Sequence, residues 1–153
     1  MSNLLMSKKT VPVTGGAGYI GSHAVLALLD AGHQVTVLDN LVNGCRAVVE
    51  KVRKVPFIEG DICNRDLLDR VFTECSVDAV FHFAAYAYVG ESVADPAKCY
   101  RNNVGGSLTL LEAMVAAGAL TFVLSSTCAT HGMPKRVPIE GSLFKLGCPH
   151  RRL

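Results

Sequence analysis

The chain lacks the features that mark several broad classes of protein. Charged residues make up only 18% of its 153 residues, the formal net charge is +2, and basic and acidic side chains are mixed along most of the sequence. No nucleic-acid partner is therefore expected. No apolar run, including the short one at Leu4, Leu5 and Met6, reaches the length of a signal peptide or membrane span. We predict a cytoplasmic location and no membrane partner.

The cysteines show no pattern of a metal site or of a disulfide framework. There are six, at Cys45, Cys63, Cys75, Cys99, Cys128 and Cys148. They are widely scattered, with no Cys-x-x-Cys pair and no His at ligand spacing. Free, mostly buried thiols are expected, and no metal is predicted.

The apolar residues that are present alternate between short β-branched runs and longer stretches with helical spacing. The short runs predict strands at Val11–Thr14, Val35–Leu38, Val55–Ile58, Ala79–Phe83 and Thr121–Ser125. Most are apolar throughout, which is typical of a parallel sheet with helices on both faces. Half of the residues are hydrophobic, and a chain of this length buries one ordinary core. One α/β domain is predicted.

Helices are expected between these strands. The first places Ile20, Ala24 and Leu28 on one face, and Gly32 follows where a left-handed cap would close the helix. The second follows Asn64 as its cap, with an apolar face made of Leu67, Leu68, Val71 and Phe72.

The longest predicted helix begins at Asp95-Pro96, a cap residue followed by proline at the first helical position, and ends at Gly118. Its apolar positions are Tyr100, Val104, Leu108, Leu111 and Val115. Gly105 and Gly106 lie inside it at a cost in helix stability, which predicts close packing there.

A glycine-rich turn joins the first strand to the first helix. Gly15, Gly18 and Gly21 have a G-x-x-G-x-x-G spacing, which allows positive φ and brings the backbone and helix N-terminus up to a pyrophosphate. The second strand ends on Asp39, about 20 residues on, where a carboxylate accepts from the adenosine ribose. That charge would repel the extra phosphate of NADP, and no arginine follows at Asn40. NAD is the predicted cofactor.

Seven segments occur in the same order and with the same spacing as in UDP-glucose 4-epimerases. They are Gly15–Ser22, Leu38–Leu41, Glu59–Ile62, His82–Ala85, Val89–Ser92, Asn102–Val104 and Ser125–Thr130. In residues 11–140 the chain thus resembles this family of extended short-chain dehydrogenases/reductases. The resemblance implies a Rossmann-type doubly wound parallel sheet, incomplete at its C-terminal end. Residues 1–10 would then be an extension and residues 141–153 a divergent tail.

The resemblance also assigns residues to the parts of NAD. Tyr19 and Ile20 would lie along the pyrophosphate, Asp39 and Asn40 along the adenosine ribose, and Asp61 and Ile62 at the adenine. Phe83, Ala84 and Ala85 would form the floor under the nicotinamide half, with Asn102 as a further contact. A solvated carboxylate at Asp61 and a merely structural amide at Asn102 remain open alternatives.

Thr127 matches the catalytic Ser or Thr of such epimerases, at the carboxyl edge of the sheet. Related dehydratases carry Thr-Asp-Glu at this point, whereas this chain has Thr127-Cys128-Ala129, which favours an epimerase. The resemblance implies interconversion of UDP-glucose and UDP-galactose through a 4-keto intermediate, in galactose metabolism. It also implies a nucleotide-sugar partner and a homodimer formed through the long helices.

The general base of the family is missing from these 153 residues. The family supplies it with Tyr-x-x-x-Lys, but the four tyrosines here, Tyr19, Tyr86, Tyr88 and Tyr100, all precede Thr127. We therefore expect this chain to be inactive alone. A catalytically silent NAD-binding or regulatory module and a non-functional gene fragment are the alternatives.

Two further departures from the family bear on stability and affinity. Pro12 removes a hydrogen-bond donor from the first strand, so that strand is expected to be shifted or weakened. Ala87 stands where many epimerases carry a lysine near the cofactor. Because the last elements of the family fold have no counterpart in the sequence, we also predict marginal stability or aggregation.

Overall fold

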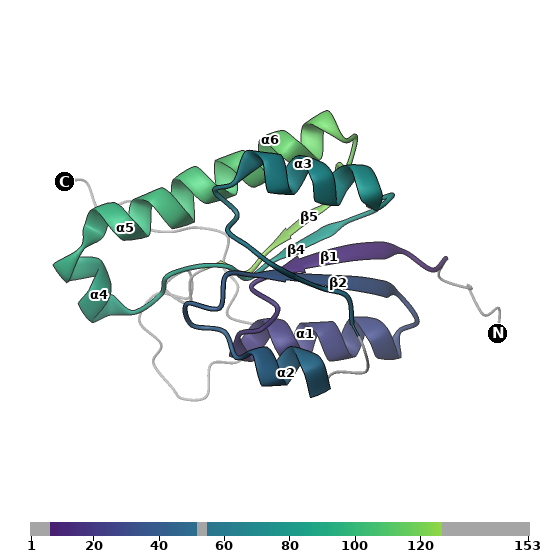
Figure 1. Cartoon of the computed structure of the whole chain (residues 1–153), viewed down its shortest axis with the longest axis horizontal. Coiled ribbons are helices and arrows are strands. Elements are labelled where there is room, and N and C mark those ends of the chain that lie inside the picture. The colour runs from purple at the N-terminus through teal and green to yellow at the C-terminus, as the bar shows by residue number, and fades with distance from the viewer. Residues whose placement is uncertain (1–6, 52–54, 127–153) are drawn as a thin grey trace, which may run out of the picture.

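The computed structural model describes residues 7–51 and 55–126, which form one parallel sheet covered by helices on both faces (Figure 1). The five strands lie in the order β3-β2-β1-β4-β5, and all the neighbouring pairs are parallel. Helices α1 and α2 cover one face, and α3 and α6 cover the other. The predicted α/β class and Rossmann-type sheet are confirmed, and the order reverses between β1 and β4, where such sheets bind ligands.

All five strands are close to the predicted ranges, with the first two slightly longer than predicted and the last three shorter. They are β1 (Thr10–Thr14), β2 (Gln34–Asp39), β3 (Phe57–Glu59), β4 (Val80–His82) and β5 (Phe122–Leu124). The prediction began the third strand at Val55, but β3 begins after Pro56, which has no N–H to donate to a ladder. The carbonyl of Pro56 still accepts from Val37 N at 2.9 Å.

Pro12 does not shift β1. It pairs with Thr36 in the register that runs from Thr10 to Thr14, so that half of the prediction is wrong. The pairing of β1 with β4 is short and covers only Val13 and Thr14. The carbonyls of Thr10 and Thr14 accept from Asp78 N and Phe83 N, on the side of β1 that faces β4. Backbone groups of successive residues in a strand point to opposite sides, so the nitrogen of Pro12 points to the β4 side too. The absent donor therefore falls on the shorter of the two ladders.

Helix α1 (Tyr19–Asp30) ends in a Schellman motif, as the position of Gly32 predicts. Gly32 has φ of +86°, its N–H donates to Leu29 O, and His33 N donates to Leu28 O. The expected buried face is partly wrong, because Ile20 is 60% exposed, while Gly21 and Val25 are buried. The helix is therefore rotated so that its glycine faces the turn. Helix α2 (Arg46–Lys51) packs beside it, and Val49 joins the same core cluster.

Helix α3 (Arg65–Glu74) agrees with its prediction in cap and in face. The Asn64 side chain accepts from Leu67 N at 3.1 Å. Leu68, Val71 and Phe72 are buried, and Leu67 is partly buried against them. With Ile62 and Leu110, this face forms the core on the second side of the sheet.

The long predicted helix is continuous but changes its winding. Asp95 caps α5 (Pro96–Tyr100) by accepting from Lys98 N at 3.0 Å, and α6 (Ser107–Ala116) closes with Gly118 at φ of +74°. Between them, η1 (Arg101–Gly106) is a π-helical segment. A short helix, α4 (Val89–Ala94), precedes α5.

The apolar positions predicted for this helix do not form its buried face. Their exposed fractions are 70% for Tyr100, 58% for Val104, 56% for Leu108, 37% for Leu111 and 69% for Val115. The buried face is instead formed by Cys99, Asn102, Gly106, Leu110, Ala113 and Met114. Close packing is confirmed at Gly106, where an added Cβ would lie 2.8 Å from the Ile62 side chain, but Gly105 faces open space.

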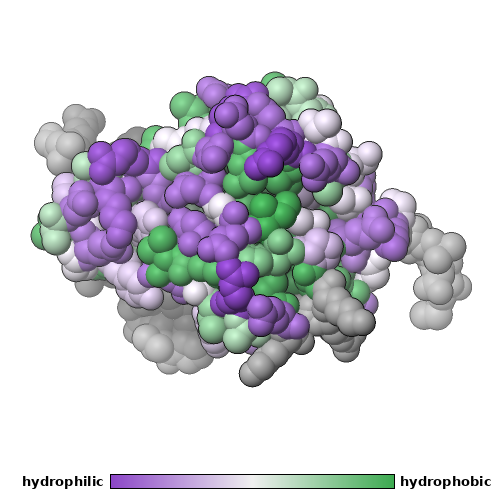
Figure 2. Space-filling view, in the orientation of Figure 1, coloured by the Kyte–Doolittle hydropathy of each residue, from purple (hydrophilic) through white to green (hydrophobic). Residues whose placement is uncertain are grey.

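Figure 2 shows hydrophilic and hydrophobic residues intermixed on one face of the described residues, 7–51 and 55–126. No helix in them is long and apolar enough to cross a membrane. They also contain no cluster of three His, Cys, Asp or Glu residues that could hold a metal ion.

Candidate functional site

The glycine turn after β1 is fixed by contact with the segment that follows β4. Gly15 has φ of +73° and its N–H donates to Leu38 O at 2.8 Å. A Cβ on Gly15 would lie 2.5 Å from Ala84 N, closer than real Cβ contacts come. Only glycine therefore satisfies both the positive φ and the close approach of these two segments.

The turn also packs tightly on the start of α1. A Cβ on Gly21 would lie 2.1 Å from Gly15 O, and Gly18 N donates to the same oxygen at 3.2 Å. Gly18 is the N-cap and provides no side-chain hydrogen bond, so no side-chain cap occupies this helix N-terminus. First-turn amides with the positive end of the helix dipole attract an anion. This end of α1 is suited to a phosphate group.

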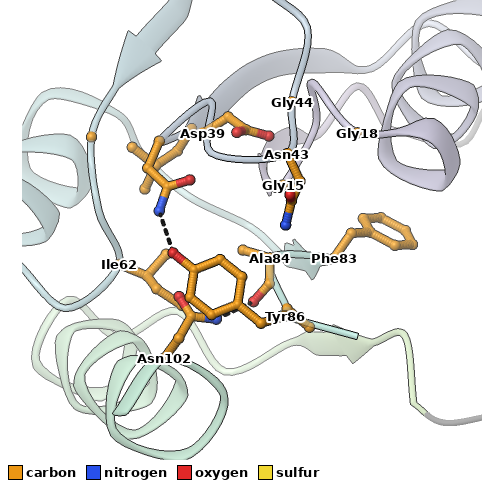
Figure 3. Close-up of a pocket in the computed structure, with 14 residues that line it drawn as sticks. Gly15, Gly18, Asp39, Asn43, Gly44, Ile62, Phe83, Ala84, Tyr86 and Asn102 are labelled. Carbon is orange, nitrogen blue, oxygen red and sulfur yellow. Dashed lines mark hydrogen bonds between the residues drawn. The ribbon is translucent and has the colours of Figure 1, made fainter. Parts of the chain in front are cut away.

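Asp39 connects the end of β2 to the glycine turn (Figure 3). The side chain is buried, its Oδ2 accepts from Ala17 N at 3.0 Å, and its Oδ1 accepts from Leu41 N at 2.8 Å. Each carboxylate oxygen has a second lone pair, so Asp39 keeps acceptor capacity for a ligand hydroxyl. A Cβ on Gly44 would lie 2.7 Å from Oδ1, which explains the glycine there.

Asn40 and Asp61 bridge the ends of β2 and β3. Asn40 Nδ2 donates to Asp61 Oδ2 at 3.3 Å, and Cys63 N donates to Oδ1 at 2.8 Å. Partial burial of Asp61 opposes ionisation, but the hydrogen bonds from Cys63 and Asn40 outweigh it and hold the pKa of Asp61 below its ordinary range. Asp61 is thus a carboxylate at neutral pH.

The segment after β4 is held by two consecutive amides of η1. Asn103 Oδ1 accepts from Tyr86 N at 2.9 Å, and Asn103 Nδ2 donates to Tyr86 O at 3.0 Å. The buried Asn102 donates to Asn103 Oδ1 at 2.8 Å and to Ala84 O at 3.4 Å. Asn102 therefore stabilises the segment after β4 as well as lining the site. π-Helical turns are frequent at functional sites, and here one bears both amides.

A buried histidine ties this helix to the sheet. His82 Nδ1 lies 2.6 Å from Thr14 Oγ1, and its Nε2 lies 3.0 Å from Ser107 Oγ. Because Ser107 Oγ donates to Asn103 O at 2.8 Å, it accepts from His82, which places a proton on Nε2. Burial lowers the pKa of His82, which favours the neutral form with this Nε2 proton. Its sequence signal was a lone histidine in an apolar strand, and no role was predicted for it.

These elements enclose one pocket at the carboxyl edge of the sheet (Figure 3). Of the predicted cofactor residues, the pocket lining includes Gly15, Gly18, Asp39, Asn40, Ile62, Phe83, Ala84, Ala85 and Asn102. Tyr19, Ile20, Gly21 and Asp61 are not in the lining, and Tyr19 and Ile20 are exposed. Leu38, Asn43, Gly44, Gly60 and Tyr86 also line it and were not predicted. The predicted catalytic Thr127 and the boundary after Glu140 fall outside the described residues.

The unpredicted lining residues had different sequence signals. Gly44 and Gly60 are glycines that follow strand ends, a pattern that could have suggested close approach. Tyr86 directly follows the predicted site residues Phe83, Ala84 and Ala85 and could have been included on position alone. For Asn43, a loop residue, the sequence offers no distinguishing feature.

Comparison with known proteins places this geometry in one family. The model of the NAD dependent epimerase/dehydratase family matches residues 11–150. The chain is 53% identical to a UDP-glucose 4-epimerase of Rhizobium leguminosarum bv. trifolii over 135 residues, covering 88% of the chain and 40% of the relative. The chain thus spans about 40% of the length of such relatives.

Two solved structures have the same fold. One is UDP-glucose 4-epimerase from Brucella ovis in complex with NAD, with a TM-score of 0.76 and 46% identity over 88% of this chain and 40% of that one. The other is the Bifidobacterium longum enzyme in complex with NAD+ and UDP, with a TM-score of 0.77 and 38% identity over 87% and 41%. From the family match, these likenesses and the glycine turn, the chain belongs to the NAD dependent epimerase/dehydratase family.

Proposed function

We propose that this chain is an NAD-binding domain of the UDP-glucose 4-epimerase type, which binds NAD but does not turn over substrate alone. The observation that carries this proposal is the pocket that joins the glycine turn, Asp39 and the segment after β4. The cradle fits a dinucleotide, since Gly15 and Gly18 present bare backbone to the pocket beside the N-terminus of α1, which no side chain caps. In a complete site, NAD would supply a hydride acceptor and, once reduced, the donor that returns the hydride within the same reaction.

The residues present have distinct roles toward that cofactor. The uncapped N-terminus of α1 would receive the pyrophosphate, and Asp39 the hydroxyls of the adenosine ribose. Phe83, Ala84 and Ala85 would lie under the nicotinamide half, where the Asn102 and Asn103 amides fix the backbone. The acidic charge of Asp39 favours NAD over NADP.

The proposed lack of turnover rests on the missing base. The 153 residues contain no Tyr-x-x-x-Lys, and without it the substrate hydroxyl has no phenolate to take its proton. Thr127 is proposed to contact the sugar hydroxyl in a complete site. A nucleotide sugar such as UDP-glucose or UDP-galactose is the proposed substrate class, by similarity to the relatives that bind UDP.

Calorimetric titration of the chain with NAD, beside a coupled assay that converts UDP-galactose to UDP-glucose, tests this function. We expect saturable NAD binding with no turnover. Absence of binding would favour the alternative of a non-functional fragment. Turnover would contradict the proposed lack of activity and would require a general base other than the four tyrosines. NADP is the matched control and is expected to bind more weakly.

We also propose that the chain self-associates through the long helix. Tyr100, Val104, Leu108, Leu111 and Val115 are each at least 37% exposed and repeat at helical spacing. A second copy would cover this stripe. Light scattering should find a dimer that Leu108→Lys disrupts, whereas Ala116→Lys, at an exposed position of the same helix outside the stripe, should leave it intact. A monomeric wild-type chain would overturn this proposal.

A further inference from the structure

Tyr86 lies where no cofactor role was predicted, yet it crosses the pocket (Figure 3). It comes from the segment after β4, and its hydroxyl lies within hydrogen-bond distance of Asn40, which follows β2. Asn40 Nδ2 donates to the Tyr86 hydroxyl at 3.4 Å and to Asp61 Oδ2 at 3.3 Å. Tyr86, Asn40 and Asp61 thus form a polar chain over the ends of β4, β2 and β3.

This polar chain can form hydrogen bonds to a ligand. Both bonds are longer than the usual 2.9–3.0 Å, so they cost little to exchange. The Tyr86 hydroxyl acts only as an acceptor among its described hydrogen bonds, which leaves its proton to donate. A ligand hydroxyl, ring nitrogen or phosphate oxygen is the partner that such a donor would take.

Tyr86 is held in place through both its backbone and its ring. Its backbone N–H and C=O both bind the Asn103 amide. Lys98 Nζ lies 4.8 Å from the centroid of the ring, which is a cation–π contact, and Lys98 is itself paired with Glu91. An aromatic ring fixed in this way presents its hydroxyl with little loss of conformational entropy on binding.

We infer that Tyr86 determines specificity for the adenosine half of a dinucleotide. Its hydroxyl donates to a polar atom of that half, and its ring forms an apolar wall of the pocket together with Ile62. Asp39, the acceptor for this half that lines the pocket, lies at the end of β2, so Tyr86 supplies a donor from the opposite rim. This inference rests on the proposed binding of NAD.

The test uses the full chain and two variants that each lose one hydroxyl. Tyr86→Phe keeps the ring and the contact with Lys98, and Tyr88→Phe is the matched control, because Tyr88 is 63% exposed and does not line the pocket. Calorimetry measures the affinity for NAD and for ADP-ribose. The fluorescence of reduced nicotinamide mononucleotide reports binding of the other half, and a chain without tryptophan interferes little with it.

We expect Tyr86→Phe to weaken NAD and ADP-ribose by the same factor, about 3- to 10-fold, the loss of one ordinary hydrogen bond. Binding of reduced nicotinamide mononucleotide and the thermal midpoint should not change, and Tyr88→Phe should match the wild type. Unchanged affinity for ADP-ribose would overturn the inference, as would equal weakening of all three ligands. If the wild-type chain did not bind NAD, that result would instead contradict the proposed function itself.

Discussion

The two rims of the pocket are built in different ways. On the β2 and β3 side, the oxygens of Asp39 and Asp61 accept from backbone N–H groups, at Leu41 and Cys63 two residues on and at Ala17 in the glycine turn. On the β4 side, neutral amides from η1 bind the backbone of residues 17 or 18 positions earlier in the chain. One rim thus offers charge and acceptors to a ligand, whereas the other provides a rigid floor.

The glycine turn is the element that both rims share, so a change there should have the largest effect. Gly15→Ala would place a methyl group 2.5 Å from Ala84 N and strain a φ of +73°. We expect a loss of about 2–4 kcal/mol in the free energy of unfolding and no measurable NAD binding. Urea unfolding and calorimetry measure the two effects.

The matched control for the turn is Gly105→Ala, because nothing lies within 4 Å of a Cβ at that glycine. A helical alanine there should raise stability by up to about 1 kcal/mol and leave NAD binding unchanged. If both alanine variants behaved alike, close approach at Gly15 would not be what fixes the turn.

The charged rim is tested by Asp39→Asn. An amide cannot accept from both Ala17 N and Leu41 N, so one buried donor loses its partner and the ribose loses a charged acceptor. We expect NAD affinity to fall about 10- to 100-fold and the preference over NADP to narrow. Calorimetry with both cofactors checks this, and the exposed Asp66→Asn should show neither effect. Equal losses for NAD and NADP would argue against a role in cofactor choice.

The neutral rim is tested by Asn103→Ala. The variant loses both hydrogen bonds to the Tyr86 backbone, which should cost about 1–2 kcal/mol of stability and weaken NAD about 3- to 10-fold. Thr109→Val, which removes a hydroxyl bond within the same helix, is the control. Amide exchange at Tyr86 N should accelerate only in Asn103→Ala. Unaltered exchange would mean that other contacts hold the floor.

The smallest expected effect is a pH dependence of the free energy of unfolding, caused by His82 on the neutral rim. Burial lowers the pKa of His82 below its ordinary value near 6.5, so the unfolded chain binds the proton more readily. Stability from this residue is complete above about pH 6.5 and decreases as the pH falls toward the folded pKa, by at most about 1.4 kcal/mol per pH unit.

Urea unfolding between pH 5 and 7.5 measures that slope. His82→Gln should flatten the curve, whereas His23→Gln, at an exposed position of α1, should leave it as in the wild type. An identical slope in His82→Gln would assign the pH dependence to other groups.

The same difference between the rims decides what the sequence could predict. The glycine spacing, the place of Asp39 at a strand end and the Asn64 and Asp95 caps are local patterns, and each of them was predictable. The contacts of Asp39 with Ala17, of Asn103 with Tyr86 and of His82 with Thr14 join residues 17 to 68 positions apart, which periodicity does not report. The face of α6 failed for a third reason, since this helix carries apolar residues on two sides and spacing alone cannot say which meets the sheet, whereas the face of α3 was predicted correctly.

The π-helical segment has a consequence for which changes of length this chain can tolerate. A π-helix closes its hydrogen bonds over one more residue per turn than the α-helices on either side of it, so deleting one residue from Arg101–Gly106 would let the segment wind as an α-helix with α5 and α6 still in phase. The rewinding would carry Asn102 away from Ala84 and separate Asn103 from the Tyr86 backbone. Substitutions at the exposed Val104 or Gly105 should therefore be far milder than any insertion or deletion beside them.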